Sequence, residues 1–229
     1  DSTDTLVVVG EAGDEATLGT GRSRVLSGVA GNQKKYVQDD AVLVLSSSIE
    51  AEYSGTAVFY LKDLNGKDGF RLDGGSSKDG SGHSVSYAGD LNKDGYDDII
   101  IGAPEADGTA GEAYVVFGKR SWSRYMRLSS LNGKTGFTLS GDESGDFTGK
   151  SVSTAGDIYW DGYDDIMIGA FLATPNSVSE EGGKAYVFLG KKSGYSSTFD
   201  LTKLNGSNGC TFESENGDDH LGRSVGTAG

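Results

Sequence analysis

Short side chains that carry oxygen occur at alternate positions between residues 90 and 98. Gly95 stands at the sixth position of this stretch and permits a sharp turn, which allows the flanking side chains to converge. Hard oxygen ligands spaced in this way around a glycine are the ligands that Ca²⁺ selects. The stretch therefore predicts a calcium site whose ligands are Asp90, Asn92, Asp94, the backbone carbonyl of Tyr96, and Asp98.

The residues that follow this stretch predict a β-strand rather than a helix. An EF-hand would need a bidentate Glu at the twelfth position, but Ile101 occupies that position. Ile101 closes an apolar, β-branched run over residues 99–101, a pattern typical of a buried strand. We therefore expect a calcium loop that joins two strands, in which Asp97 either points away from the ion or caps the loop.

A second stretch, residues 157–165, repeats this pattern with one change. Tyr159 stands where the first stretch has Asn92, and a tyrosine cannot place its oxygen so close to an ion. Two interpretations remain open: a weaker calcium site in which water fills the gap, or a vestigial turn held by hydrogen bonds. The ligands expected for the first interpretation are Asp157, Asp161, the backbone carbonyl of Tyr163, and Asp165.

Both stretches lie within a longer repeat. The segment 82–90 returns as 149–157 and again as 222–229, at offsets of 67 and 73 residues. Each unit has room for four short strands separated by turn residues, as in a propeller blade. The expected fold is all-β: a β-propeller of four-stranded antiparallel blades, present as a partial propeller of about three complete blades.

The repeat divides the chain into five expected segments. We expect an outer strand of a preceding blade with its connection at 1–17, and a degenerate blade at 18–74. A blade with a calcium loop follows at 75–141, and a blade with an altered calcium loop at 142–214. The first strand of a further, truncated blade is expected at 215–229. In the degenerate blade, residues 29–38 contain lysines but no carboxylate, so no metal is expected there, and 55–61 takes the place of the third strand. The end of the sequence one residue before the next expected Asp favours truncation of a longer chain.

Composition and charge exclude several classes of function. The formal net charge is −14, with 34 acidic and 20 basic residues, which argues against a nucleic-acid partner. The longest apolar runs, 6–9 and 41–45, are too short to span a membrane. The single cysteine, Cys210, excludes an internal disulfide and a Cys-based zinc site. Cys210 replaces Phe70 and Phe137 of the other units, which favours a small core residue over a thiol for intermolecular pairing.

The repeat unit resembles a known family. The motif Asp-x-Asn-x-Asp-Gly-x-x-Asp, followed by Gly102-Ala103-Pro104 and preceded by a Gly-x-Ser-Val strand, is similar to the FG-GAP repeat. That repeat is the blade of the integrin α-subunit β-propeller and its microbial relatives, and the resemblance is strongest over 64–229. It implies calcium in the loops between first and second strands, and an extracellular or cell-surface protein that serves adhesion or assembly.

We therefore expect a non-catalytic, calcium-binding module that mediates adhesion, protein–protein interaction or surface assembly. The alternatives are a lectin-like glycan-binding propeller and a propeller domain attached to a secreted hydrolase or lyase. The sequence has no nucleophile elbow, His-Glu-x-x-His helix or Ser/His/Asp set. Its carboxylates could form an acid/base pair, but most have a calcium or turn role first.

Several single residues have simpler interpretations. His83 and His220 lie in turn segments and are expected to be turn histidines rather than catalytic or metal-binding groups. Asn205 begins an Asn-Gly-Ser glycosylation sequon, a triplet that also occurs by chance. An aromatic stretch within 119–130 forms either a partner-facing patch or packing over the outer strands; it contains Trp122, Tyr125 and Met126.

Charge is expected to segregate between the two faces of the propeller. In the FG-GAP architecture, loops from fourth to first strands and from second to third strands share one face. These loops are rich in Asp and Glu, whereas the third-to-fourth connections on the other face are rich in Lys and Arg. The acidic face is either a solvated surface, a site for a protein or glycan partner, or one half of a head-to-tail self-assembly contact. The acidic loops are 74–81, 104–110, 141–148, 171–181 and 214–220.

Overall fold

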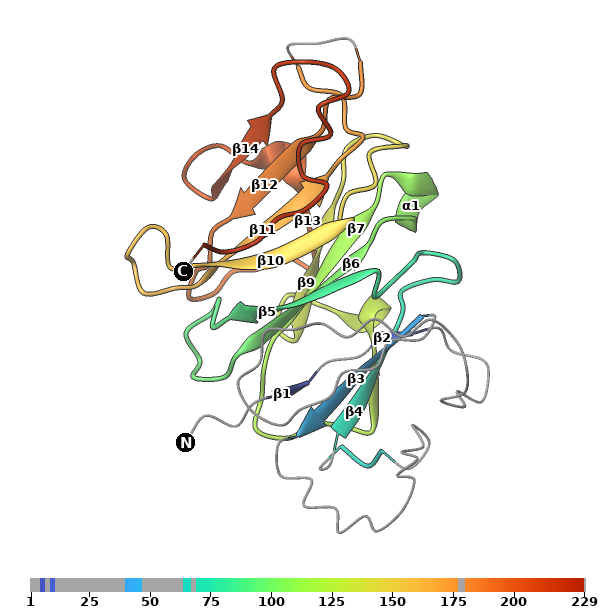
Figure 1. Ribbon diagram of the computed structural model, residues 1–229. Helices are drawn as coiled ribbons and strands as arrows, with labels where there is room; N and C mark the ends of the chain where they lie inside the picture. Colours follow the sequence, from blue (N-terminus) through green and yellow to red (C-terminus); the bar gives the residue numbers. More distant parts are fainter. Residues whose placement is uncertain are drawn as a thin grey trace.

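The computed structural model describes residues 64–66, 69–176 and 180–228, together with the backbone of short strands at 5–6, 9–10 and 40–46. Its regular structure is almost entirely β-strand, arranged in three sheets (Figure 1). The prediction of an all-β fold in the form of a partial β-propeller is confirmed. The division of the chain into five blade segments stays a prediction.

Two of the sheets each contain a complete four-stranded antiparallel blade. The middle blade has the order β5-β6-β7-β9, and the C-terminal blade has the order β10-β11-β12-β14. In the middle blade, the strands are β5 (Ser84–Gly89), β6 (Asp98–Ala103), β7 (Glu112–Val116) and β9 (Gly136–Ser140). In the C-terminal blade, they are β10 (Ser151–Gly156), β11 (Asp165–Ala170), β12 (Lys184–Phe188) and β14 (Gly209–Glu213).

The second strand of the middle blade is buried on both faces, as its apolar run predicts. All six residues of β6 are buried. Because side chains alternate across a strand, Ile99 and Ile101 join the core that contains Phe70 and Leu72 of β4 (Gly69–Asp73). Ile100 points the other way, into the core shared with the C-terminal blade. The blades are therefore held together by apolar cores between successive sheets.

The recurring Gly-x-Ser-Val segment forms a joint between successive blades. The Ser84 hydroxyl donates a hydrogen bond to the Gly149 carbonyl at 2.8 Å, and Ser151 repeats this bond to Gly222 at 2.8 Å. At Gly102, an added Cβ would lie 1.9 Å from the Gly149 carbonyl oxygen, so only glycine permits the approach. The repeat in the sequence thus encodes contacts between blades as well as strands within them.

Two short strands that the sequence analysis did not predict also connect the sheets. β8 (Tyr125–Arg127) pairs in parallel with β4 (Gly69–Asp73), and β13 (Thr198–Asp200) pairs in parallel with β9. Each is followed by a 3₁₀ turn, η2 (Leu128–Ser130) or η3 (Leu201–Lys203), whose leucine is buried. The connection between third and fourth strands therefore adds an edge strand to the preceding sheet.

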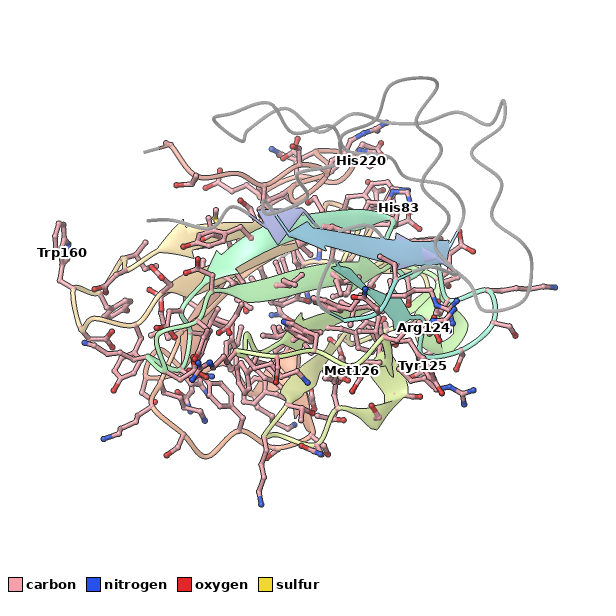
Figure 2. All side chains as sticks on the ribbon, turned by 90° about the horizontal axis from the view of Figure 1, so that it is seen from below. His83, Arg124, Tyr125, Met126, Trp160 and His220 are labelled. Carbon is pink, nitrogen blue, oxygen red and sulfur yellow. The ribbon has the colours of Figure 1, made fainter. Side chains whose placement is uncertain are left out.

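Aromatic rings attach these connections to the preceding outer strand. Trp122 stacks on Phe70 of β4, with ring centroids 3.7 Å apart, and Tyr195 stacks on Phe137 of β9 at 4.7 Å. The stretch around Trp122 thus packs over the outer strand, which was one of its two expected roles. Tyr125 and Met126 continue this stretch along β8 (Figure 2).

The N-terminal sheet is arranged differently from the two blades. It has the order β1-β3-β2-β4-β8, where β1 is Thr5–Leu6, β2 is Val9–Gly10 and β3 is Asp40–Ser46. β3 pairs antiparallel with β4, and β2 pairs with both of them. The third strand expected at 55–61 and the loop at 29–38 lie outside the described residues.

Candidate calcium-binding loops

Loop 1, residues 90–98, connects β5 to β6 and is folded by its own side chains. Asp90 accepts hydrogen bonds from the backbone N–H groups of Asp94 and Gly95, at 3.0 and 2.8 Å. The Asn92 oxygen accepts from Asp94 N–H at 2.9 Å, and Asp94 accepts from Tyr96 N–H at 3.0 Å. Because every oxygen has two lone pairs, each acceptor keeps capacity for a further ligand.

Asp98 ties this loop to the body of the blade. Its side chain is buried, with a residue exposure of 1%, and its two oxygens accept from Leu91 N–H at 2.9 Å and Gly118 N–H at 2.8 Å. Burial raises the pKa of Asp98 to about 7; the two backbone hydrogen bonds oppose the shift, and the charges of Asp94 and Asp90 add to it. A cation beside these carboxylates would stabilise their charged forms.

Loop 2, residues 157–165, connects β10 to β11 and repeats the same hydrogen bonds. Asp157 accepts from Asp161 N–H at 2.9 Å and Gly162 N–H at 2.8 Å, and Asp161 accepts from Tyr163 N–H at 3.0 Å. Asp165 accepts from Ile158 and Gly190, and burial raises its pKa to about 6. These shared bonds show that loop folding alone does not distinguish a calcium site from a vestigial turn.

The third position is where the two loops differ. Asn92 of loop 1 is partly buried and bonded within its loop, whereas Tyr159 of loop 2 is 58% exposed. The adjacent Trp160 is 91% exposed and projects outward (Figure 2). Loop 2 therefore lacks the side-chain oxygen that loop 1 has at this position.

The donor set of loop 1 suits calcium in its chemistry, since it consists of carboxylate, amide and carbonyl oxygens. Among the described residues, however, no three His, Cys, Asp or Glu side chains are gathered closely enough to hold a metal ion as they stand. Ion binding would require the carboxylates to rotate inward while the backbone of the loop is retained.

The residue beside the last ligand has a different contact in each loop. Asp97, which is not one of the predicted ligands, accepts a hydrogen bond from the Tyr87 hydroxyl of β5 at 3.3 Å. Its counterpart Asp164 accepts from Asp90 N–H of loop 1 at 2.8 Å. The sequence analysis did not assign a role to Asp164, although the Asp-Asp pair recurs in both units.

The described parts of the acidic loops lie together on the side of the blades opposite loops 1 and 2 (Figure 1). Glu105 N–H bonds to the Asp79 carbonyl, and Phe147 N–H bonds to the Thr109 carbonyl of α1 (Ala106–Thr109). Near α1, a hollow of about 520 Å³ is lined by four carboxylate residues and one lysine, among others: Asp79, Glu105, Asp107, Glu112 and Lys78. This region has the acidic character that the sequence predicts.

Not every acidic residue of these loops is available to a partner. Asp79 and Asp146 are 3% and 5% exposed. Asp79 accepts from Ser76 and Ser81 N–H, and Asp146 accepts from Glu143 N–H. These two carboxylates hold turns, so the acidic surface is smaller than the sequence count suggests.

The remaining single residues are placed as follows. His220 stacks on Phe171 with centroids 5.9 Å apart, and its Nδ1 lies 2.7 Å from the Asp218 carbonyl oxygen, as expected of a turn histidine. Cys210 is only partly buried in β14, so the expectation of a core position is wrong. Asn205 is exposed, and its glycosylation stays a prediction.

Comparison with known proteins identifies the class of repeat. Residues 81–116 match the family model of the FG-GAP repeat, a range that contains β5, loop 1, β6 and β7. An antiparallel blade with this loop between its first and second strands defines a propeller of the FG-GAP class. The match ends before loop 2, which carries the altered third position.

The particular relatives are integrin α subunits. The chain is 31% identical over 169 residues to integrin alpha-6 of Homo sapiens, covering 70% of this chain and 13% of that protein. It is 32% identical over 146 residues to integrin alpha-5 of Xenopus laevis, covering 60% of this chain and 13% of that protein. The chain is thus an FG-GAP, integrin-like protein that spans about an eighth of the length of these relatives. No helix among the described residues is long and apolar enough to cross a membrane.

Proposed function

We propose that the chain is a non-catalytic, calcium-stabilised propeller module of an extracellular or cell-surface protein, where it mediates adhesion, protein–protein interaction or surface assembly. The observation that carries the proposal is loop 1: an oxygen donor set on a backbone fixed by its own side chains, in a chain similar to integrin α subunits. The similarity to these cell-surface proteins supports the location and the role in adhesion.

Calcium would add positive charge where the chain concentrates carboxylates. In loop 1 it would be held by Asp90, Asn92, Asp94, the Tyr96 carbonyl and Asp98; in loop 2, by Asp157, Asp161, the Tyr163 carbonyl and Asp165. Asp98 already joins the loop to the turn at Gly118. Fixing Asp98 would therefore stabilise the connection after β7 as well as the loop itself.

The test is thermal unfolding of the chain in calcium and in chelator. A site at ten times its dissociation constant adds about 1.4 kcal/mol to the free energy of unfolding. The melting temperature should fall in chelator, and Asp94→Ala should remove most of that difference. Asp97→Ala is the matched control, because Asp97 is exposed, acidic and in the same loop but outside the ligand set. An unchanged melting curve in chelator would contradict the calcium proposal.

For the partner, we propose a protein with basic groups that contacts the acidic loops around α1. Glu105 and Asp107 are exposed there, and both line the hollow with Glu112. Self-assembly, with the basic connections of another copy as the partner, uses the same chemistry. Exposed charges are screened over about 8 Å at physiological ionic strength. Sedimentation velocity at low and high salt should show association that weakens with salt, and salt-insensitive association would refute this charge-based contact.

A glycan-binding role is the second candidate, and the exposure of Tyr159 and Trp160 is the observation that favours it. However, Lys93 occupies the position of Trp160 in loop 1 and lies 5.3 Å from the Tyr163 ring of the next blade. In loop 1, where the following blade is described, the side chain at this position therefore contacts that blade. Glycan-array binding that is lost in Trp160→Ala would favour the lectin alternative.

A further inference from the structure

Loop 2 holds the first residue of loop 1 by both of its backbone groups. The Asp164 carboxylate accepts a hydrogen bond from Asp90 N–H at 2.8 Å. The Asp164 N–H in turn donates to the Asp90 carbonyl at 3.4 Å. A bond from an N–H group to a carboxylate is stronger than one to a neutral acceptor. One residue of the C-terminal blade thus fixes the backbone position of a predicted ligand in the middle blade.

The next residue of loop 1 is fixed by the same blade. The buried Leu91 accepts two hydrogen bonds at its carbonyl, from Lys191 N–H at 2.9 Å and from the Tyr195 hydroxyl at 3.0 Å. Lys93 completes the contact by lying over the Tyr163 ring. The first turn of loop 1 is therefore positioned by the C-terminal blade as well as by Asp98 of its own blade.

The fit between the two loops is close at Gly89. This residue has φ of +76°, and a Cβ built on it would lie 2.3 Å from the Asp164 carboxyl carbon. Gly156 has φ of +67° at the same place in the C-terminal blade, yet nothing lies within 4 Å of its Cβ position. The local backbone is alike, so the difference comes from the presence of Asp164.

We infer that Asp164 is a positioning residue that couples loop 1 to loop 2. Its neighbours Tyr163 and Asp165 are predicted ligands of loop 2, while Asp164 itself holds the first ligand of loop 1. The inference rests on the proposed calcium function. An ion in loop 2 would fix residues 163–165, and with them the Asp164 carboxylate and N–H group that bond to the backbone of Asp90. Because Asp90 is a predicted ligand of loop 1, this favours binding of an ion in loop 1. Because coupling between two sites is reciprocal, an ion in loop 1 favours binding in loop 2 to the same degree.

The experiment is calorimetric titration of the chain with Ca²⁺, using variants that leave the ligands of loop 1 intact. Asp164→Ala should weaken binding at loop 1 by on the order of ten-fold, within the range typical of coupled sites. Asp164→Asn keeps an oxygen acceptor and should recover part of this affinity. Asp97→Ala is the matched control and should leave the affinity of loop 1 unchanged, because the Asp97 carboxylate accepts a hydrogen bond from Tyr87 of its own blade and is not a predicted ligand.

A variant of loop 2 separates coupling from a purely structural role. Asp161→Ala removes a predicted ligand of loop 2 and the acceptor for Tyr163 N–H but no contact to Asp90, so it should weaken binding at loop 1 while leaving hydrogen exchange at Asp90 N–H without calcium unchanged. In the double variant Asp161→Ala/Asp164→Ala, the two effects should be less than additive, since both break the same connection. Hydrogen exchange at Asp90 N–H, measured without calcium, should be faster in Asp164→Ala and unchanged in Asp97→Ala.

The outcomes distinguish the inference from the function on which it rests. If the wild-type chain binds no Ca²⁺, both are overturned. If it binds Ca²⁺ but the affinity of loop 1 is the same in the wild type, Asp164→Ala and Asp161→Ala, only the coupling is overturned. Should Asp164→Ala fail to fold, Asp161→Ala and Asp164→Asn decide the question by the same comparison.

Discussion

The middle blade and the C-terminal blade have the same strands and loops, but they differ in what covers them. Leu139 of β9 is completely buried, because it lies in the core shared with the C-terminal blade. Its counterpart Phe212 of β14 is 55% exposed. An apolar residue at this position of an outer strand is therefore buried by the following sheet and not by its own. The two blades form a matched pair in which the contribution of a neighbour can be measured.

The largest expected effect in this comparison is on core packing. Leu139→Ala should lower the free energy of unfolding by about 2–5 kcal/mol, because it removes a fully buried side chain. In the 229-residue chain studied alone, Phe212→Ala should change it by less than about 1 kcal/mol, because much of that ring contacts solvent there. Urea denaturation of both variants measures the difference. Equal losses would show that burial of the outer strand does not depend on the following sheet.

A smaller effect is expected at the matched glycines. Gly156→Ala should cost about 1–2 kcal/mol, the usual strain of a side chain in a left-handed conformation. Gly89→Ala carries the same strain and must also displace Asp164, so it should cost about 1–3 kcal/mol more. The same denaturation experiment tests this pair. Equal costs would mean that Asp164 moves aside freely, which would also weaken its assignment as a positioning residue.

The features that the sequence predicts are those repeated within each unit. The apolar run 99–101 indicates a strand buried on both faces, and β6 is such a strand. The alternation of Asp and Asn predicts a calcium loop between two strands; the stretch does join β5 to β6, and its ligation of calcium stays a prediction. Such patterns are local, so their physical cause is contained in a few consecutive residues.

Contacts between units could not be predicted from the sequence, because their causes are not contained in a few consecutive residues. β8 and β13 each have three residues, too few for a hydrophobic period, and each pairs with a sheet that is distant in sequence. Asp164 looks like a second copy of Asp97, yet its partner belongs to another blade. The expectation for Cys210 failed likewise, since the burial of Phe70 depends on Trp122, a residue of the next unit. A repeated sequence signal therefore specifies a blade better than it specifies the neighbours of that blade.

The finest difference between the blades is the third position of their loops, and it can be removed by one substitution. Tyr159→Asn gives loop 2 the same oxygen donor that Asn92 supplies in loop 1. If both loops bind calcium through this position, the variant should gain up to about 1.4 kcal/mol of calcium-dependent stability at ten times the dissociation constant. Unfolding with and without chelator measures that gain. Trp160→Asn is the control, because Trp160 is exposed and adjacent but occupies no ligand position. Asn tolerates the left-handed backbone at residue 160, so this control can raise stability in chelator and calcium alike. A gain in Tyr159→Asn that appears equally in chelator would show that the third position affects folding of the loop and not the binding of an ion.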